Sequence, residues 1–115
     1  MLRMITLFAE TTICTISFCV ISLFIPTGDM HMGPTGVYLE AETNWAMTIG
    51  TFGIGAAELE SHERGHMVQR QEMDVLYWLI VGVPSAISMN IDTPREHMNR
   101  WYELQATEYG NELYN

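Results

Sequence analysis

The feature that most constrains the fold is a long apolar stretch near the beginning of the chain. No charged residue lies between Thr11 and Ile25, and apart from Glu10 the uncharged stretch extends further toward the N-terminus. A helix that crosses a bilayer needs about 20 mostly apolar residues, so this stretch suffices only if Glu10 lies near an interface. We therefore divide the chain into an apolar segment, residues 1–27, and one folded domain, residues 28–115.

Three interpretations of the apolar segment compete. We favour a signal anchor, in which Arg3 directs the N-terminus inward and the rest of the chain outward. A cleaved signal peptide fits less well, because no small-x-small cleavage site follows the apolar run. Buried strands are a rival, because the run is rich in Ile, Thr, Val and Phe, which favour sheets. An anchor predicts membrane association in a bacterial envelope, whereas buried strands predict a cytoplasmic protein.

The charge balance argues against nucleic-acid partners. The chain has 14 Asp and Glu residues against five Arg and no Lys, which gives a net charge of −9. Proteins that bind nucleic acid carry a basic stripe that displaces counterions from phosphates, and this sequence has none. We expect no nucleic-acid partner.

The middle of the chain alternates between turn-rich and extended stretches. Gly28–Gly36 is rich in Gly, Pro and Met and predicts a loop, within which we expect His31 to be exposed. Extended stretches at Gly36–Glu42 and Trp45–Ile54 predict a β-hairpin around a Glu-Thr-Asn turn. Glycines in the second stretch indicate bulges or a close backbone neighbour.

Helical patterns follow from Ala56 onward. The first helix carries two histidines, and a second uncharged run, Val75–Ile91, contains Gly82 and Pro84, which bend or break helices. For this run we favour a helix pair in the core behind the site over re-entry into a membrane. A last helix is expected over about residues 96–108. The predicted fold class is α+β: a small domain with a β-hairpin and metal-binding helices.

The segment His62-Glu63-Arg64-Gly65-His66 carries the clearest chemical signal. Residues four apart on a helix lie one above the other, so both imidazoles can bind the same tetrahedral zinc ion. Glu63 is offset toward the open side, where it can take a proton from a water that the ion activates. The segment predicts a Zn²⁺ cofactor with Glu63 as the general base of a hydrolase.

A catalytic zinc takes three protein ligands, so one more is needed. Gln69 and Glu72 stand where a longer form of the motif has Gly and His, and Glu72 would point away from the metal. His97 and Glu103, both on the last helix, are the candidates. We favour Glu103, because the small residue Ala106 three positions later lets two helices approach closely.

Longer segments resemble a known family. The run His62–Gln71 followed by Leu76–Ser88 is similar to small, often membrane-anchored zincin-like zinc metallopeptidases, and to the C-terminal module of some bacterial Rhs-type repeat proteins. There a His-Glu-x-Gly-His-x-x-Gln helix precedes a Leu-Tyr-x-x-x-x-Gly-x-Pro-Ser segment and a Tyr/Thr-Glu-x-x-Ala-Asn/Asp-x-x-Gly helix. The last piece corresponds to Tyr102–Gly110, and the resemblance covers about Trp45–Gly110.

The resemblance implies a glutamate-type zincin in which Glu103 completes the metal site of His62 and His66. Thr107 stands where the family usually has Asn or Asp, a residue that can orient a metal-binding histidine. Because Thr reaches less far, metal affinity or activity would be reduced. Gln69, also part of the family pattern, is the other candidate for such a supporting contact.

Two hypotheses about function follow. The first is a zinc-dependent peptidase at a membrane, whose peptide or protein substrate adds to the edge of the Trp45–Ile54 strand. The alternative is a non-catalytic zinc-binding or interaction module, which the shortness of the chain favours. No oxyanion-stabilising residue is evident, because Tyr38, Tyr102 and Tyr109 each suit packing better. Charged residues around the histidines disfavour a metal site within the bilayer.

Overall fold

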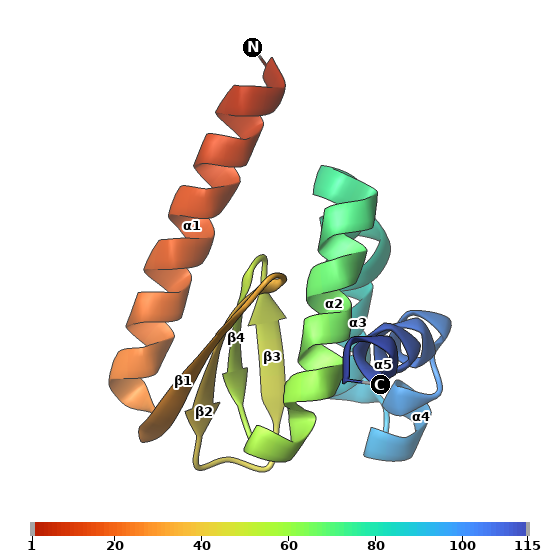
Figure 1. The fold of residues 1–115 in the computed structure, drawn as a ribbon. Coiled ribbons are helices and arrows are strands. Elements are labelled where there is room, and N and C mark those ends of the chain that lie inside the picture. Colours follow the sequence, from red (N-terminus) through yellow and green to blue (C-terminus); the bar gives the residue numbers. More distant parts are fainter. Residues whose placement is uncertain (1, 115) are drawn as a thin grey trace.

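The computed structural model describes residues 2–114 as an α+β fold with a four-stranded mixed sheet and five α-helices (Figure 1). A π-helical stretch, η3, precedes α3, and short helical turns, η1 and η2, flank α2. The bounds are α1 Leu2–Phe24, β1 Thr27–Gly33, β2 Gly36–Ala41, β3 Ala46–Ile49, β4 Phe52–Gly55, η1 Ala57–Leu59, α2 Glu60–Met73, η2 Asp74–Leu76, η3 Trp78–Gly82, α3 Val83–Ile91, α4 Pro94–Met98 and α5 Trp101–Tyr114.

The apolar N-terminal segment is one helix, α1, so the interpretation as buried strands is wrong. Within it, the stretch from Leu7 to Phe24 is long and apolar enough to cross a membrane, and only 11% of it is buried. The hydroxyls of Thr12 and Thr15 donate to the carbonyls four residues earlier, which satisfies these β-branched polar residues within the helix. The expected role of Arg3 concerns a side chain outside the described part, and the domain division at residue 27 stays a prediction.

The sheet differs from the predicted hairpin. Its strand order is β1-β2-β4-β3, with a parallel β2–β4 pair between two antiparallel pairs. The expected loop contains strand β1, and Trp45–Ile54 is not one strand but a hairpin of its own, β3 and β4. This hairpin turns at Gly50 and Thr51, where Gly50 has a φ of 66° that favours glycine. As a result β3 forms one edge of the sheet, beside α2 (Figure 1).

The apolar core includes two small clusters of buried residues. One joins α1 to the sheet, and Phe18 of α1 stacks on Phe52 of β4 with ring centroids 4.8 Å apart. The other joins η3 to α5 behind α2. The buried members are Phe18, Leu39 and Ile54 in the first cluster and Tyr77, Val81 and Tyr102 in the second.

The charged residue of the apolar stretch also contacts the body of the molecule. Glu10 of α1 accepts hydrogen bonds from Arg70 Nε of α2 at 2.7 Å and from Trp78 Nε1 of η3 at 2.8 Å. All three side chains are largely buried or half-buried. Because an unpaired carboxylate in an apolar setting is costly, this contact explains how α1 tolerates Glu10 and fixes α1 against α2.

The second apolar run is not the core helix pair that we expected. The chain bends by 118° between the helices Ala57–Leu76 and Trp78–Ile91, before it reaches Gly82 and Pro84. Pro84 lies in the first turn of α3, where a missing backbone N–H costs nothing, so it does not break the helix. Most large side chains of η3 and α3 are exposed rather than buried.

The expected last helix is divided into α4 and α5. Thr93 begins α4 with a capping box, in which its hydroxyl accepts from the backbone N–H of Glu96. Helix α4 ends at Met98, and α5 begins at Trp101 in a new direction (Figure 1). The break lets α5 pack on α2 while His97 of α4 contacts Glu103 of α5.

Candidate metal centre

The candidate site lies where α5 crosses α2. A Cβ atom on Gly65 would lie 1.7 Å from the carbonyl oxygen of Ala106, and one on Gly110 would lie 2.0 Å from that of Ser61. The helices therefore touch backbone to backbone at two glycines, and Ala106 is fully buried. This is the close approach that Ala106 predicted, and it places Glu103 opposite the histidines of α2.

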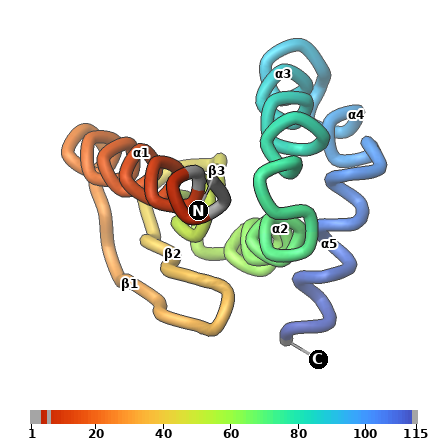
Figure 2. Tube along the Cα trace, turned by 90° about the horizontal axis from the view of Figure 1, so that it is seen from above, coloured from red at the N-terminus to blue at the C-terminus, as the bar shows by residue number. Residues whose placement is uncertain are grey.

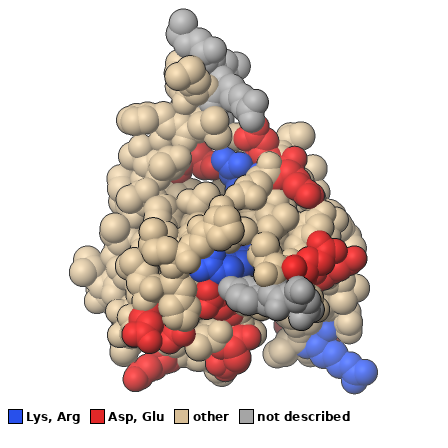
Figure 3. All heavy atoms as spheres, in the orientation of Figure 1, with Lys and Arg blue, Asp and Glu red and all other residues tan. Residues whose placement is uncertain are grey.

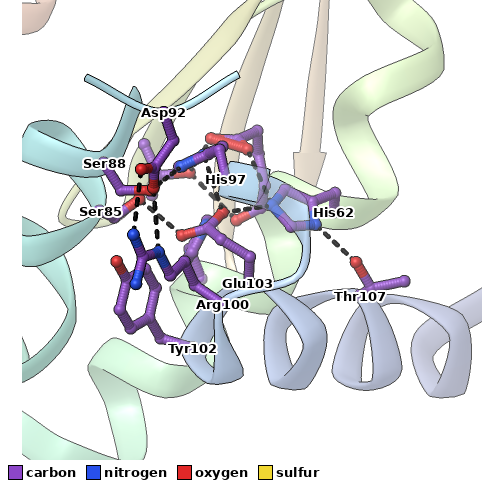
Figure 4. A network of polar contacts seen from close by, with 12 residues as sticks. His62, Ser85, Ser88, Asp92, His97, Arg100, Tyr102, Glu103 and Thr107 are labelled. Carbon is purple, nitrogen blue, oxygen red and sulfur yellow. Dashed lines mark hydrogen bonds and ion pairs between the residues drawn. The ribbon is translucent and has the colours of Figure 1, made fainter. Parts of the chain in front are cut away.

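The three residues that we expected to bind zinc lie together. Glu103 Oε1 is 2.9 Å from His62 Nε2 and 3.0 Å from His66 Nε2 (Figure 4). The two imidazole rings are perpendicular, with centroids 4.9 Å apart. Glu103 is 1% exposed and His66 4% exposed, so this cluster is screened from solvent.

The rival ligand His97 lies at the same place. It comes from α4, and its Nε2 is 3.4 Å from Glu103 Oε1. Figure 4 shows His97 and His62 on two sides of the Glu103 carboxylate. Three imidazole nitrogens therefore surround one carboxylate oxygen. The two rival candidates for the third ligand, His97 and Glu103, are neighbours.

Hydrogen bonds around Gln69 define which nitrogen of His66 carries a proton. Gln69 Nε2 donates to the carbonyl of Tyr102 at 2.8 Å and to Gln105 Oε1 at 2.9 Å, so Gln69 Oε1 must be an acceptor. This oxygen is 2.7 Å from His66 Nδ1, which therefore donates. In the neutral ring the lone pair is then on Nε2 and faces Glu103, as in histidines that bind metals.

The other two imidazoles have similar supports (Figure 4). His62 Nδ1 is 2.8 Å from the hydroxyl of Thr107. The hydroxyl of Ser88 donates to Asp92 and lies 2.9 Å from His97 Nδ1, so it accepts from this nitrogen. His97, like His66, thus has its neutral-form lone pair on Nε2, toward the cluster.

Glu63 lies between the cluster and the edge of the sheet. The Thr48 hydroxyl of β3 is 3.0 Å from Glu63 Oε1 and 3.1 Å from the Glu63 carbonyl. The other oxygen, Glu63 Oε2, is 3.8 Å from His62 Nε2. Ligand atoms of His62, Glu63 and His66 all lie within 4.8 Å of one another. The carboxylate is thus held at one oxygen and directed at the histidines with the other.

Sequence reasoning missed three of these supporting hydroxyls. Ser85 of α3 donates to Glu103 Oε2 at 2.6 Å, and it stands in the Pro-Ser part of the family pattern, which was the available signal. Thr48 and Ser88 reach the site only because β3 and α3 pack beside α2 and α4. No spacing along the chain indicates such contacts.

The electrostatics of the cluster favour a cation. Burial opposes ionisation of Glu103, but hydrogen bonds from His62 and His66 outweigh it and hold the pKa of Glu103 well below its usual range. Burial likewise disfavours a charged His66, yet the hydrogen bond to Glu103 and the charge of Glu63 raise the pKa of His66 above its usual value. A proton held by His66 is therefore stabilised here, and a metal cation competes for the same lone pair.

The donor set suits zinc. Zinc prefers imidazole nitrogen and carboxylate oxygen in a tetrahedral arrangement, in which ligand atoms lie about 3.4 Å apart. The separations of 2.9 and 3.0 Å between Glu103 and the two histidines of α2 are a few tenths of an ångström shorter. A small outward shift of one carboxylate would admit the ion, so the residues fit it.

The tyrosines that we weighed as oxyanion donors are engaged elsewhere. The hydroxyl of Tyr38 donates to the Ala56 carbonyl, and that of Tyr102 donates to the Pro84 carbonyl. Tyr109 of α5 donates to Glu72, an exposed residue of α2.

The expectation for His31 is wrong about the element that carries it. It lies in strand β1 rather than in a loop, and its ring is paired with Glu40 at 3.2 Å and with Glu60. The pairing of β1 with β2 and two neighbouring carboxylates hold this side chain in place, 38% exposed. It takes no part in the cluster on α2.

In comparisons with known proteins, no family model, no curated protein and no solved structure matches the chain.

Proposed function

We propose that the chain is a small zincin-like, zinc-dependent peptidase in which His62, His66 and Glu103 hold the ion and Glu63 is the general base. One observation carries the proposal. The Nδ1 atom of His66 is a donor, so its Nε2 lone pair meets an acceptor-only carboxylate oxygen at 3.0 Å. Two acceptors at this distance repel each other unless a proton or a metal cation lies between them.

The side chains around the cluster suit hydrolysis. A bound zinc ion supplies Lewis acidity, which polarises a carbonyl group and lowers the pKa of water. Glu63 would take a proton from the attacking water at Oε2, because Thr48 occupies Oε1 and leaves the other oxygen turned toward the cluster. Glu63 would then give this proton to the amine that leaves as the peptide C–N bond breaks. Its burial, with 6% exposed, excludes water that would otherwise exchange the proton.

The edge of the sheet supports a peptide as substrate. The Trp45 carbonyl accepts from the Ala56 N–H, so by the alternation of antiparallel pairing Ala46 and Thr48 turn their backbone groups away from β4. A substrate backbone can pair with these groups as an added strand. Because Thr48 also holds Glu63, the paired peptide would lie beside the general base.

Membrane association is part of this proposal. Helix α1 is apolar and mostly exposed along Leu7–Phe24, and the charged residue of that stretch, Glu10, is neutralised by Arg70. These features support a role for α1 in holding the peptidase at a bilayer.

The first test is the metal content of the purified chain after zinc has been offered, measured by elemental analysis. We expect about one zinc per chain, lost in Glu103→Ala and retained in His97→Ala. The two variants are matched, because both truncate side chains that contact the same cluster. Absence of stoichiometric zinc in the unmodified chain would refute the proposal.

His97 gives a specific reason to consider a non-catalytic zinc module. If its Nε2 joined the other three ligands, the tetrahedral sphere would be closed and no position would be left for water. That arrangement predicts loss of zinc in His97→Ala as well as in Glu103→Ala. It also predicts that a zinc-loaded sample cleaves nothing in a broad peptide library.

The role of Glu63 is tested by Glu63→Gln, which keeps the size of the side chain and its contact with Thr48. We expect peptide hydrolysis to fall by a factor on the order of 10² to 10⁴, because no general base remains, while zinc content is unchanged. Glu58→Gln, an exposed glutamate outside the cluster, serves as the control. Equal rates in Glu63→Gln and the unmodified chain would exclude this mechanism.

A further inference from the structure

The segment formed by η3 and α3 presents an apolar surface. No charged residue lies between Asp74 and Asp92, although both ends of the segment are acidic. Single exposed apolar residues are common on proteins, but a contiguous apolar surface marks a contact with lipid or protein. The large exposed side chains are Leu79 (73%), Ile80 (43%), Val83 (52%), Ile87 (54%), Met89 (44%) and Ile91 (73%).

This surface lies on the same side of the molecule as α1. In the view from above, α1 and α3 lie toward one edge of the molecule, whereas β1 and the end of α5 lie toward the opposite edge (Figure 2). A groove of about 390 Å³ between α1 and η3 joins the two elements, and its lining includes Ile13, Ile49 and Trp78. The apolar surfaces of α1 and α3 are therefore parts of one face.

The opposite face is charged. Figure 3 views the molecule from the side away from α3, and acidic side chains gather there around the lower part of the sheet and beside α5. With a net charge of −9, these groups need water around them. The molecule thus has an acidic face and a face that is apolar except for the exposed Arg95 and Glu96 of α4 beside α3, and the division favours a bilayer surface over a second protein chain as the partner.

The packing of α1 decides how it meets the bilayer. Phe18 in its second half stacks on the sheet, and Glu10 in its first half binds Arg70 of α2, so the body of the molecule lies alongside α1 (Figure 1). If α1 crossed a bilayer upright in this arrangement, charged residues of the body would share its depth, which is costly. A helix that lies along the surface avoids this cost.

We propose that α1 and the η3–α3 segment together form a monotopic membrane-binding face, which lies in the outer layer of a bilayer with the metal cluster on the aqueous side. The inference rests on the packing of α1 and the exposure of α3, and it does not depend on zinc. It adds a second lipid contact, residues 78–91, to the one expected from α1.

Photolabelling tests this face on the 115-residue chain bound to phosphatidylcholine vesicles. One vesicle sample carries a lipid with a diazirine near the headgroup, and another carries it at the end of the acyl chain. Trypsin cleaves after the arginines, which separates residues 4–64, 71–95 and 101–115. We expect the shallow probe to label peptides 4–64 and 71–95 but not 101–115, and the deep probe to label none of them strongly.

Three outcomes would overturn the proposal. Shallow label confined to peptide 4–64 would mean that α3 does not touch lipid. Strong deep label in that peptide alone would mean that α1 crosses the bilayer upright. Shallow label absent from peptide 71–95, together with links between the 71–95 peptides of two chains in a parallel sample treated with a bifunctional protein crosslinker, would assign the surface to a second copy.

A matched pair of variants checks the assignment. Ile87 and Leu104 are equally exposed, at 54% and 53%, but only Ile87 lies on the proposed face. We expect Ile87→Glu to reduce shallow labelling of peptide 71–95 several-fold, because a carboxylate resists entry into the apolar layer, and Leu104→Glu to leave it unchanged. Equal labelling of peptide 71–95 in both variants would contradict the proposal.

Discussion

At the scale of single residues, Glu103 is fixed by contacts to both of its carboxylate oxygens. Oε1 faces the imidazoles and Oε2 accepts the hydroxyl of Ser85. A ligand whose rotamer is already fixed loses little conformational entropy when it binds a metal. The same reasoning applies to His66, which Gln69 orients.

Thr107 offers a direct test of these supports. Thr107→Val keeps the shape of the side chain but removes the hydroxyl that contacts His62 Nδ1. We expect zinc affinity to fall by about 10- to 100-fold, as is typical when such a support is lost. Competition with a fluorescent chelator measures the change, and Thr51→Val, at an exposed turn position, is the control. Equal affinities in the two variants would show that the hydroxyl does not support the ligand.

The pKa shifts predict how acidity affects stability. The lowered pKa of Glu103 gives a contribution to folding stability that is present above about pH 4.3 and is lost as the pH falls through the lowered pKa. The raised pKa of His66 gives a contribution to folding stability that is present below about pH 6.5 and is lost as the pH rises through the raised pKa. Without metal, the Glu103–His66 pair therefore stabilises the fold most between about pH 4.3 and about pH 6.5.

Zinc binds the neutral form of an imidazole. The stabilisation that zinc gives should therefore rise with pH, whereas the stabilisation that protonated His66 gives falls. We expect the increase in Tm on adding zinc to grow as the pH rises from about 5.5 to about 8. Thermal unfolding with zinc and with a chelator, at several pH values, measures it. An increment that is constant across this range would contradict a site that contains His66.

The spacing of residues along the chain predicted only part of the candidate metal site. His62 and His66 could be recognised because four residues on one helix is a local relation. Glu103 could be favoured because Ala106 indicated a close helix crossing. Thr48 and Ser85 donate, and Ser88 accepts, across elements that only tertiary packing brings together, so periodicity and spacing alone could not identify these contacts.

At the scale of elements, the crossing of α2 and α5 depends on Gly65. Gly65→Ala would place a methyl group against the Ala106 carbonyl and force the helices apart. We expect the free energy of unfolding to fall by about 1–3 kcal/mol, as for other overpacked sites, and zinc binding to weaken because Glu103 moves away.

Gly28→Ala is the matched control for this change. The nearest atoms to its added Cβ would lie 4.0 Å away, which is an ordinary contact. Chemical denaturation and zinc titration of both variants separate crowding at the crossing from a general effect of losing a glycine. Similar losses in both variants would contradict the role given to Gly65.

Strand pairing was the feature of the elements that could not be predicted from the sequence. Extended propensity in Gly36–Glu42 and Trp45–Ile54 was clear, but propensity does not define partners. The turn at Gly50 and Thr51 made a hairpin inside the second stretch, which freed β2 to pair in parallel with β4. Strand β1 forms in a Gly- and Met-rich stretch because β2 supplies its hydrogen bonds, a relation that no local pattern contains.

At the scale of the whole molecule, the separation of charge from apolar surface predicts how membrane binding responds to salt. Attraction through the apolar face should not weaken with ionic strength, whereas the net charge of −9 repels anionic lipid until it is screened. We expect tighter binding to zwitterionic than to anionic vesicles at low salt, and equal binding at about 1 M salt. Vesicle sedimentation measures both, and preference for anionic vesicles would contradict this view.

The crossing of α2 and α5 has a consequence for the life of the protein in a cell. An ion held by His62 and Glu103 would cross-link positions 41 residues apart, and closing a loop of that length removes chain entropy worth about 4 kcal/mol from the unfolded state. That is a large fraction of the stability of a small domain. Chains without zinc would therefore unfold and be degraded first, so the abundance of the protein would follow the supply of the metal.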